Sequence, residues 1–182
     1  FFFSNNIFSQ NVSNKLIKEY EDTLRVIAEQ IMFAKKESDR IKANNGFIPI
    51  LKEVLSFDKS FKYPFDSLET LAILSPEDKS FRLFNWILRK DNGTYDYFCL
   101  IHYNNKKKKK FEIFELFDKS ETIRNEKFED LDSKNWYGAL YYEIIYIKKS
   151  GRKYYTLLGW DGNDGRSTKK IIEPIYFSGK NK

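Results

Sequence analysis

Aromatic and β-branched residues gather in short runs over residues 136–177. The stretch reads WYGALYYEIIYI, turns at KSGR, returns as YYTLLGW, turns again at DGNDG and leaves as IIEPIYF. Short apolar runs separated by Gly, Asn and Asp are typical of a meander of antiparallel strands. Because this is the longest strongly patterned apolar segment, it predicts the centre of the hydrophobic core.

Two further strands are predicted over residues 81–89 and 94–103. They flank Asp91-Asn92-Gly93, and Asn-Gly between alternating apolar runs is the strongest short-range signal for a hairpin. Another strand is expected over 111–117, after a run of lysines, and residues 71–74 suit a short strand or the end of a turn.

An amphipathic helix is predicted over residues 12–42. Ser13 can cap its start, and Asn-Asn-Gly at residues 44–46 is a plausible stop. A short second helix is expected over 47–57, with Pro49 in its first turn. The polar face carries charges of both signs, which does not suit a membrane surface, so we expect the helix to pack on the sheet. The apolar stripe steps by three and four residues: Leu16, Tyr20, Leu24, Ile27, Ala28, Ile31 and Ala34.

These elements predict an α+β fold, with N-terminal helices packed on an antiparallel sheet meander of about six strands. One domain is expected over residues 11–182, helical over 12–57 and mainly β over 71–177. A chain of 182 residues is long enough to bury a real core. Its 41% hydrophobic and 32% charged residues indicate a globular protein.

Residues 1–10, FFFSNNIFSQ, read as the end of a signal-peptide apolar segment and its cleavage region, with Ser9 as the small residue before the cut. We therefore predict an exported protein, periplasmic or at the cell surface. The segment is far shorter than the roughly 20 apolar residues that span a bilayer, so no transmembrane segment is predicted. The last predicted strand stops close to the end of the chain, and we expect a truncated C-terminus.

The net charge of +6 depends on one local run of lysines. Without the five lysines the balance would be +1, which argues against a nucleic-acid partner, because such a partner favours basic residues spread over a face. The run is expected at a hairpin tip, where it would aid solubility. An anion contact with lipid headgroups, acidic polysaccharide or nucleic acid stays open. The run consists of Lys106, Lys107, Lys108, Lys109 and Lys110.

Cys99 is the only cysteine and His102 the only histidine. They lie three residues apart in a predicted strand, where side chains alternate, so they should point to opposite faces and cannot form a thiol–imidazole dyad. A single histidine also removes most histidine-based metal sites, and no phosphate-binding loop or zinc spacing occurs. We predict no metal and no cofactor.

The turn DGNDG over residues 161–165 resembles half of a calcium loop, but Gly165, Arg166 and Ile172 stand where such a loop needs an oxygen ligand, glycine and glutamate. A hairpin tip is the simpler interpretation. If the tip binds a ligand, its polar rim beside an aromatic side chain suits a sugar or a peptide. The weak candidates are Trp160, Asp161, Asn163, Asp164 and Arg166.

Glu143 and Glu173 are acidic residues within otherwise apolar strands. A buried pair of carboxyl groups would suit glycoside hydrolysis. Solvent-facing positions on an edge strand explain both residues more simply, and Pro174 favours an edge because it cannot donate to a ladder.

Four segments carry a resemblance: SPEDKSFRLFNW at residues 75–86, WYGALYY at 136–142, YYTLLGWDGN at 154–163 and KKIIEPIYF at 169–177. They resemble a group of uncharacterised exported proteins of Gram-negative bacteria, from about residue 63 onward. The resemblance implies a signal peptide ahead of a helical N-terminus and a longer chain. It implies no activity and no site residues.

Together these observations predict an exported, envelope-associated binding or interaction module. Its expected partner is a protein or a glycan of the cell envelope. The alternative is a hydrolase whose site is incomplete in this stretch of chain. Convergence of His102 and the acidic candidates in one deep pocket would favour the enzyme, whereas a shallow aromatic-faced sheet would favour binding.

Overall fold

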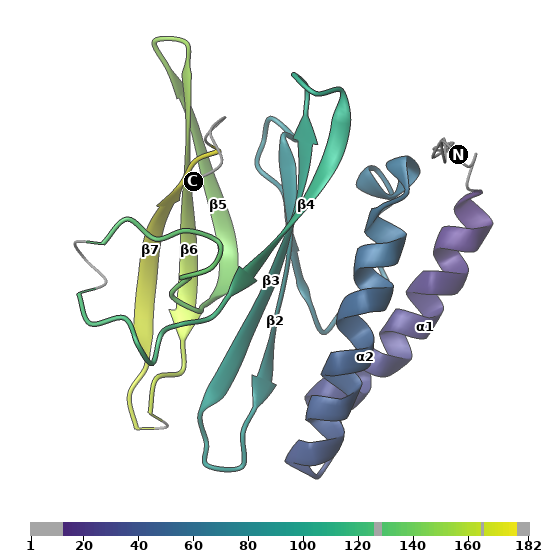
Figure 1. Ribbon diagram of the computed structural model, residues 1–182, viewed down its shortest axis with the longest axis vertical. Coiled ribbons are helices and arrows are strands. Elements are labelled where there is room, and N and C mark those ends of the chain that lie inside the picture. Colours follow the sequence, from purple (N-terminus) through teal and green to yellow (C-terminus); the bar gives the residue numbers. More distant parts are fainter. Residues whose placement is uncertain (1–12, 126–128, 165, 178–182) are drawn as a thin grey trace, which may run out of the picture.

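The computed structural model describes residues 13–125, 129–164 and 166–177, and they form three layers (Figure 1). Two antiparallel sheets, of four and three strands, pack face to face, and a pair of helices covers the far side of the larger sheet. The predicted α+β class and antiparallel pairing are confirmed. The single sheet of about six strands is wrong, because the strands divide between two sheets.

The helices and strands follow one another in a simple order. They are α1 (Asn14–Phe33), α2 (Glu37–Leu55), the short 3₁₀ helix η1 (Asp58–Phe61), β1 (Ala72–Leu74), β2 (Phe81–Arg89), β3 (Tyr95–Asn105), β4 (Lys110–Phe117), β5 (Leu140–Lys149), β6 (Arg152–Asp161) and β7 (Lys169–Ile175). Each strand pairs with its neighbour in sequence within the sheets β1-β2-β3-β4 and β5-β6-β7.

The middle of the core is β2, not the predicted meander. Phe84 and Trp86 of β2 pack against the helices, while Phe81 and Leu83 face the three-stranded sheet. Both faces of β2 are therefore buried, as in the central layer of a three-layer fold. The meander buries only one of its faces.

The predicted two helices are present, but the break between them lies at residues 34–36 rather than at 43–46, so the prediction of one helix over residues 12–42 is wrong. Ser13 caps α1 as expected, accepting a hydrogen bond from the Leu16 N–H. The break after Phe33 is held by Arg40, whose guanidinium donates to the carbonyl oxygens of Ala34 and Lys35. Its Nε also reaches the carbonyl of Arg89 at the end of β2.

The predicted stop at residues 44–46 and the predicted first-turn proline, Pro49, both lie inside α2. Asn44 faces the sheet, and its side-chain oxygen accepts a 2.8 Å hydrogen bond from the Trp86 indole. Phe47 and Leu51 are fully buried on the same face. Tertiary packing thus continues the helix through residues that favour its end.

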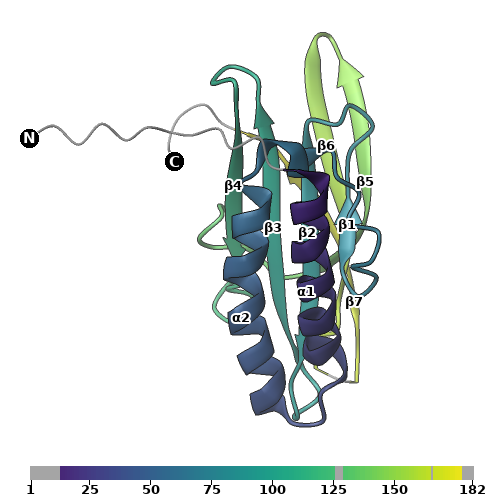
Figure 2. The same cartoon turned by 90° about the vertical axis from the view of Figure 1, so that its right-hand side faces the viewer.

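α1 and α2 lie side by side across the four-stranded sheet (Figure 2). Packing of the N-terminal helices on a sheet is confirmed, but the covered sheet is β1–β4 rather than the meander. The two sheets are joined by Asn85 of β2, which is fully buried. Its Nδ2 donates to the carbonyls of Phe98 and Ala139, and its Oδ1 accepts from the Tyr141 N–H.

Candidate functional site

No helix or strand of the described chain lies on the outer face of the three-stranded sheet (Figure 1). This face carries large apolar side chains that are exposed. The register places Ile147 opposite Tyr154 and Leu158 opposite Ile172, and directly opposed residues share a face. Tyr142 lies on the same face, since the Lys170 ammonium stands 5.1 Å from its ring centre. We call this set the outer-face cluster: Tyr142, Ile145, Ile147, Tyr154, Leu158 and Ile172.

Exposure in the outer-face cluster is high for side chains of this type. Ile172 is 74% exposed, Ile147 55%, and Tyr142 and Tyr154 each 49%. β5 is apolar on both of its faces, a pattern typical of a strand that is buried on both sides. The fold buries only the inner set, which includes Tyr141, and leaves the outer set in solvent.

Asp161, one of the predicted ligand-binding residues, points into the protein and is only 6% exposed. Its carboxylate accepts hydrogen bonds from the hydroxyls of Tyr97 and Tyr137 at 2.9 and 3.0 Å, and from the Asn163 N–H at 2.7 Å. Burial raises the pKa of Tyr97, so its hydroxyl stays a donor. Asp161 therefore organises the turn after β6.

The other four predicted residues of this turn lie near one another but differ in exposure. Trp160 is half-buried, with its ring edge-on to Tyr95 of β3. Asp164 is exposed and accepts from the backbone N–H of Arg166, which lowers the pKa of its carboxyl. Asn163 donates to the Ser167 hydroxyl. Of the five candidates, Asp164 and Arg166 are exposed, and their ligand-binding role stays a prediction.

Glu173 faces the space between the sheets, so the predicted solvent-facing position is wrong for this residue. The Tyr141 hydroxyl donates to it across 2.7 Å, and the Trp136 indole donates to that hydroxyl. Burial raises the Glu173 pKa to about 7. Both glutamates lie on edge strands, as predicted: Glu143 on β5 and Glu173 on β7. Glu143 is exposed, whereas Glu173 points inward because it pairs with the buried Leu157 of β6.

Cys99 and His102 point to opposite faces of β3, as predicted. Cys99 lies in the core between the sheets, whereas His102 is enclosed on the helix side by Phe61 and Phe111. Neither ring nitrogen of His102 has a hydrogen-bond partner within the described part of the chain. Burial, with the nearby Arg82, lowers its pKa to about 4, so the imidazole is neutral at pH 7.

Arg82 pairs with His102 across β2 and β3, and sequence reasoning missed its role. Its guanidinium donates to the backbone carbonyls of Tyr63 and Pro64, at 2.6 and 3.1 Å, and lies over the Phe84 ring. Burial lowers the Arg82 pKa to about 10. The loop after η1 is therefore held on the sheet by a buried cation, and no reactive centre results.

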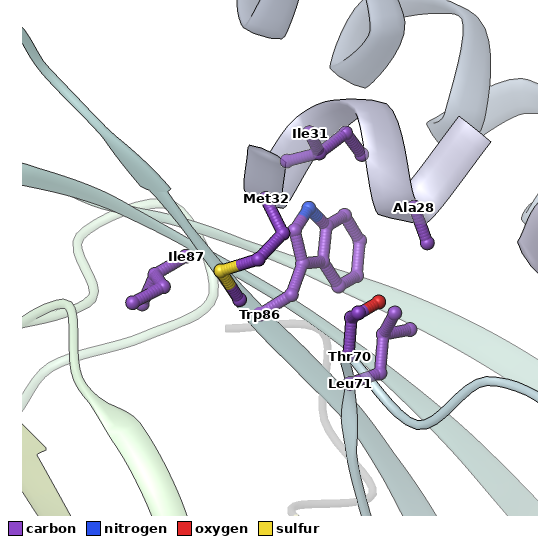
Figure 3. Close-up of a pocket in the computed structure, with 7 residues that line it drawn as sticks. All are labelled: Ala28, Ile31, Met32, Thr70, Leu71, Trp86 and Ile87. Atoms are coloured by element: carbon purple, nitrogen blue, oxygen red, sulfur yellow. The ribbon is translucent and has the colours of Figure 1, made fainter. Parts of the chain in front are cut away.

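The hollows in the described chain do not hold a convergent set of reactive groups. Between α1 and β2 lies an apolar crevice that includes Met32 and Trp86 (Figure 3), with essentially no volume open to a water-sized molecule. A groove of about 510 Å³ runs between α1 and α2, lined by residues such as Ile27 and Ala43. His102, Asp161 and Glu173 lie in three separate environments.

No protein-family model matches this sequence, and no curated protein or solved structure matches it significantly. The similarity to exported proteins of Gram-negative bacteria therefore stays a prediction. Within the described segments, neither α1 nor α2 combines the length and apolar character needed to cross a membrane. The same segments contain no group of three or more histidine, cysteine or acidic side chains arranged to hold a metal ion. The predicted signal-peptide remnant at residues 1–10 lies outside the described residues.

Proposed function

We propose that this protein is an exported interaction module that binds another protein through the outer-face cluster. The single observation that carries the proposal is the apolar face of β5–β6–β7 that no helix or strand of the described chain covers, with Ile172 74% exposed in its last strand. Soluble proteins rarely leave a contiguous apolar patch in water unless another molecule covers it. The sheet beneath already orders the backbone that carries these side chains, so binding does not have to pay for ordering a loop or segment.

A protein partner suits this face better than a glycan. Branched aliphatic side chains such as Ile145 and Ile147 stand among the tyrosines, and they gain free energy by burial against other apolar groups. Tyrosine is enriched at the centre of protein interfaces. A sugar platform would need a ring of hydrogen-bonding groups around the aromatics, and the exposed polar pair Asp164 and Arg166 lies beyond the end of β6.

Site-specific photocrosslinking in cells tests the proposal. A benzophenone side chain is placed at Ile172 and, as the matched control, at Phe33, which is 71% exposed at the end of α1. We expect discrete protein adducts from position 172 and none from 33, with the adducts lost in the Ile147→Lys background. An adduct of twice the chain mass would identify a second copy as the partner.

Three outcomes would contradict the proposal: equal adducts from positions 172 and 33, adducts that survive Ile147→Lys, or binding to envelope glycans that Ile147→Lys leaves unchanged. The hydrolase alternative has one observation in its favour, the near-neutral pKa of Glu173. It predicts turnover of a glycoside or ester that Glu173→Gln abolishes while folding is retained. Absence of any Glu173-dependent turnover across such substrates would remove that alternative.

A further inference from the structure

The fold brings two basic hairpin tips to the same end of the molecule. β3 and β4 meet at the lysine run, confirming the predicted hairpin tip there, and β5 and β6 meet at residues 148–153. Phe81 at the start of β2 pairs with Tyr103 near the first tip, and its ring packs on Tyr155 near the second. Figures 1 and 2 show both hairpins projecting beyond the sheets at this end.

The two tips concentrate positive charge that the sequence distributes over distant segments. Nine of the 32 lysines and arginines lie here, all with exposed side chains: residues Lys106, Lys107, Lys108, Lys109 and Lys110 in one tip, and Lys148, Lys149, Arg152 and Lys153 in the other. Glu112 pairs with Lys108 and Lys110, and Asp78 pairs with Lys153. Within the described chain, the other six have no carboxylate partner.

Apolar side chains flank the second tip. Ile147 is 55% exposed just before its basic residues, and Tyr154 is 49% exposed just after them, directly opposite Ile147. Basic residues beside an exposed aliphatic and an aromatic side chain are a combination suited to the interface of an anionic bilayer, where Tyr rings and Lys stems are both favoured.

We propose that this end of the molecule binds a membrane surface rich in anionic phospholipid headgroups. The basic side chains lie on two projecting turns, so a flat surface can contact both turns at once. A single-stranded nucleic acid would instead need a basic groove lined with stacking rings. Each basic residue near an anionic leaflet strengthens binding roughly fivefold, so loss of three of them weakens binding by roughly 100-fold.

Vesicle co-sedimentation tests the proposal with the full chain. We expect binding to phosphatidylglycerol-containing vesicles, weakening as salt rises, and none to pure phosphatidylcholine. The triple variant Lys148→Ser/Lys149→Ser/Arg152→Ser should bind at least tenfold more weakly. The matched control removes three exposed lysines at the opposite end, Lys35, Lys36 and Lys42, and should bind as the wild type does.

A second variant separates the apolar contribution from charge. Ile147→Ser should weaken vesicle binding several-fold while leaving its salt dependence unchanged, because no charge is removed. The proposal is overturned if the control triple loses as much affinity as the tip triple, or if binding does not depend on anionic lipid. It is also overturned if a DNA oligonucleotide binds more tightly than the vesicles, with the same sensitivity to the tip triple. The tip triple leaves the outer-face cluster intact, so protein adducts from position 172 should persist in that variant, and failure of one proposal can be distinguished from failure of the other.

Discussion

The hydroxyl of Tyr141 in β5 donates a 2.7 Å hydrogen bond to the carboxyl group of Glu173 in β7, across the intervening strand β6. The Trp136 indole donates to the same hydroxyl. Burial raises the pKa of Glu173 to about 7 from an ordinary value of 4.5. The folded state therefore favours the protonated, neutral form of Glu173, and ionisation of this carboxyl group opposes folding.

Glu173→Gln should remove a pH dependence of stability. In the wild type, the unfolded chain releases the Glu173 proton at lower pH than the folded chain does. The stabilisation that the neutral Glu173 carboxyl group gives is therefore fully present below about pH 4.5 and is lost as pH rises through about 7. For a full shift of this size, the free energy of unfolding decreases by about 3 kcal/mol. Urea unfolding at pH 5 and pH 8 measures it. An unchanged pH difference in the variant would contradict this account.

His102→Leu should act with the opposite sign. Because the folded pKa of His102 is about 4, the unfolded chain takes up a proton first as pH falls below 6.5. The wild type therefore loses the His102-linked part of its stability as pH falls from about 6.5 to about 4, whereas the variant should show no such loss. The substitution also removes two buried nitrogens that have no hydrogen-bond partner among the described residues, which should raise stability at pH 7 by about 1–3 kcal/mol. Thermal unfolding across this pH range measures both effects, and a loss of stability at pH 7 would contradict them.

Asn85→Ala should destabilise the protein strongly, because it leaves the Ala139 carbonyl and the Tyr141 N–H without their partner in the buried space between the sheets. We expect a loss of about 3 kcal/mol in the free energy of unfolding. Asn45→Ala is the control, since Asn45 is exposed on α2, and should change stability by no more than about 0.5 kcal/mol. Similar losses in the two variants would show that Asn85 does not join the sheets.

Two glycine-to-alanine changes should have opposite effects. A Cβ at Gly162 would stand 2.5 Å from the Tyr95 ring, so Gly162→Ala must displace that ring or the turn, at a cost of about 1–3 kcal/mol. A Cβ at Gly46 meets nothing within 4 Å and lies inside α2, so Gly46→Ala should stabilise by up to about 1 kcal/mol. Chemical denaturation measures the free energy of unfolding of both variants. A change of the same sign in the two variants would contradict the surroundings described for one of the two glycines.

The sequence by itself determined the features that depend on near neighbours. The Asn92 side chain accepts from the Thr94 N–H and Gly93 adopts a φ of +85°, so the predicted β2–β3 hairpin follows from local turn chemistry. The Ser13 cap and the alternation that separates Cys99 from His102 are equally local. Each needs only a few consecutive residues and their backbone preferences.

Only the tertiary structure decided which apolar faces are buried and which distant residues meet. Arg40 breaks the helical segment by reaching Arg89, and Asn44 continues α2 by binding Trp86. The division into two sheets buries both faces of β2 and exposes Ile172 in a strand that reads as core. The physical reason is that burial depends on packing between segments far apart in the chain, and local propensity is too weak to specify it.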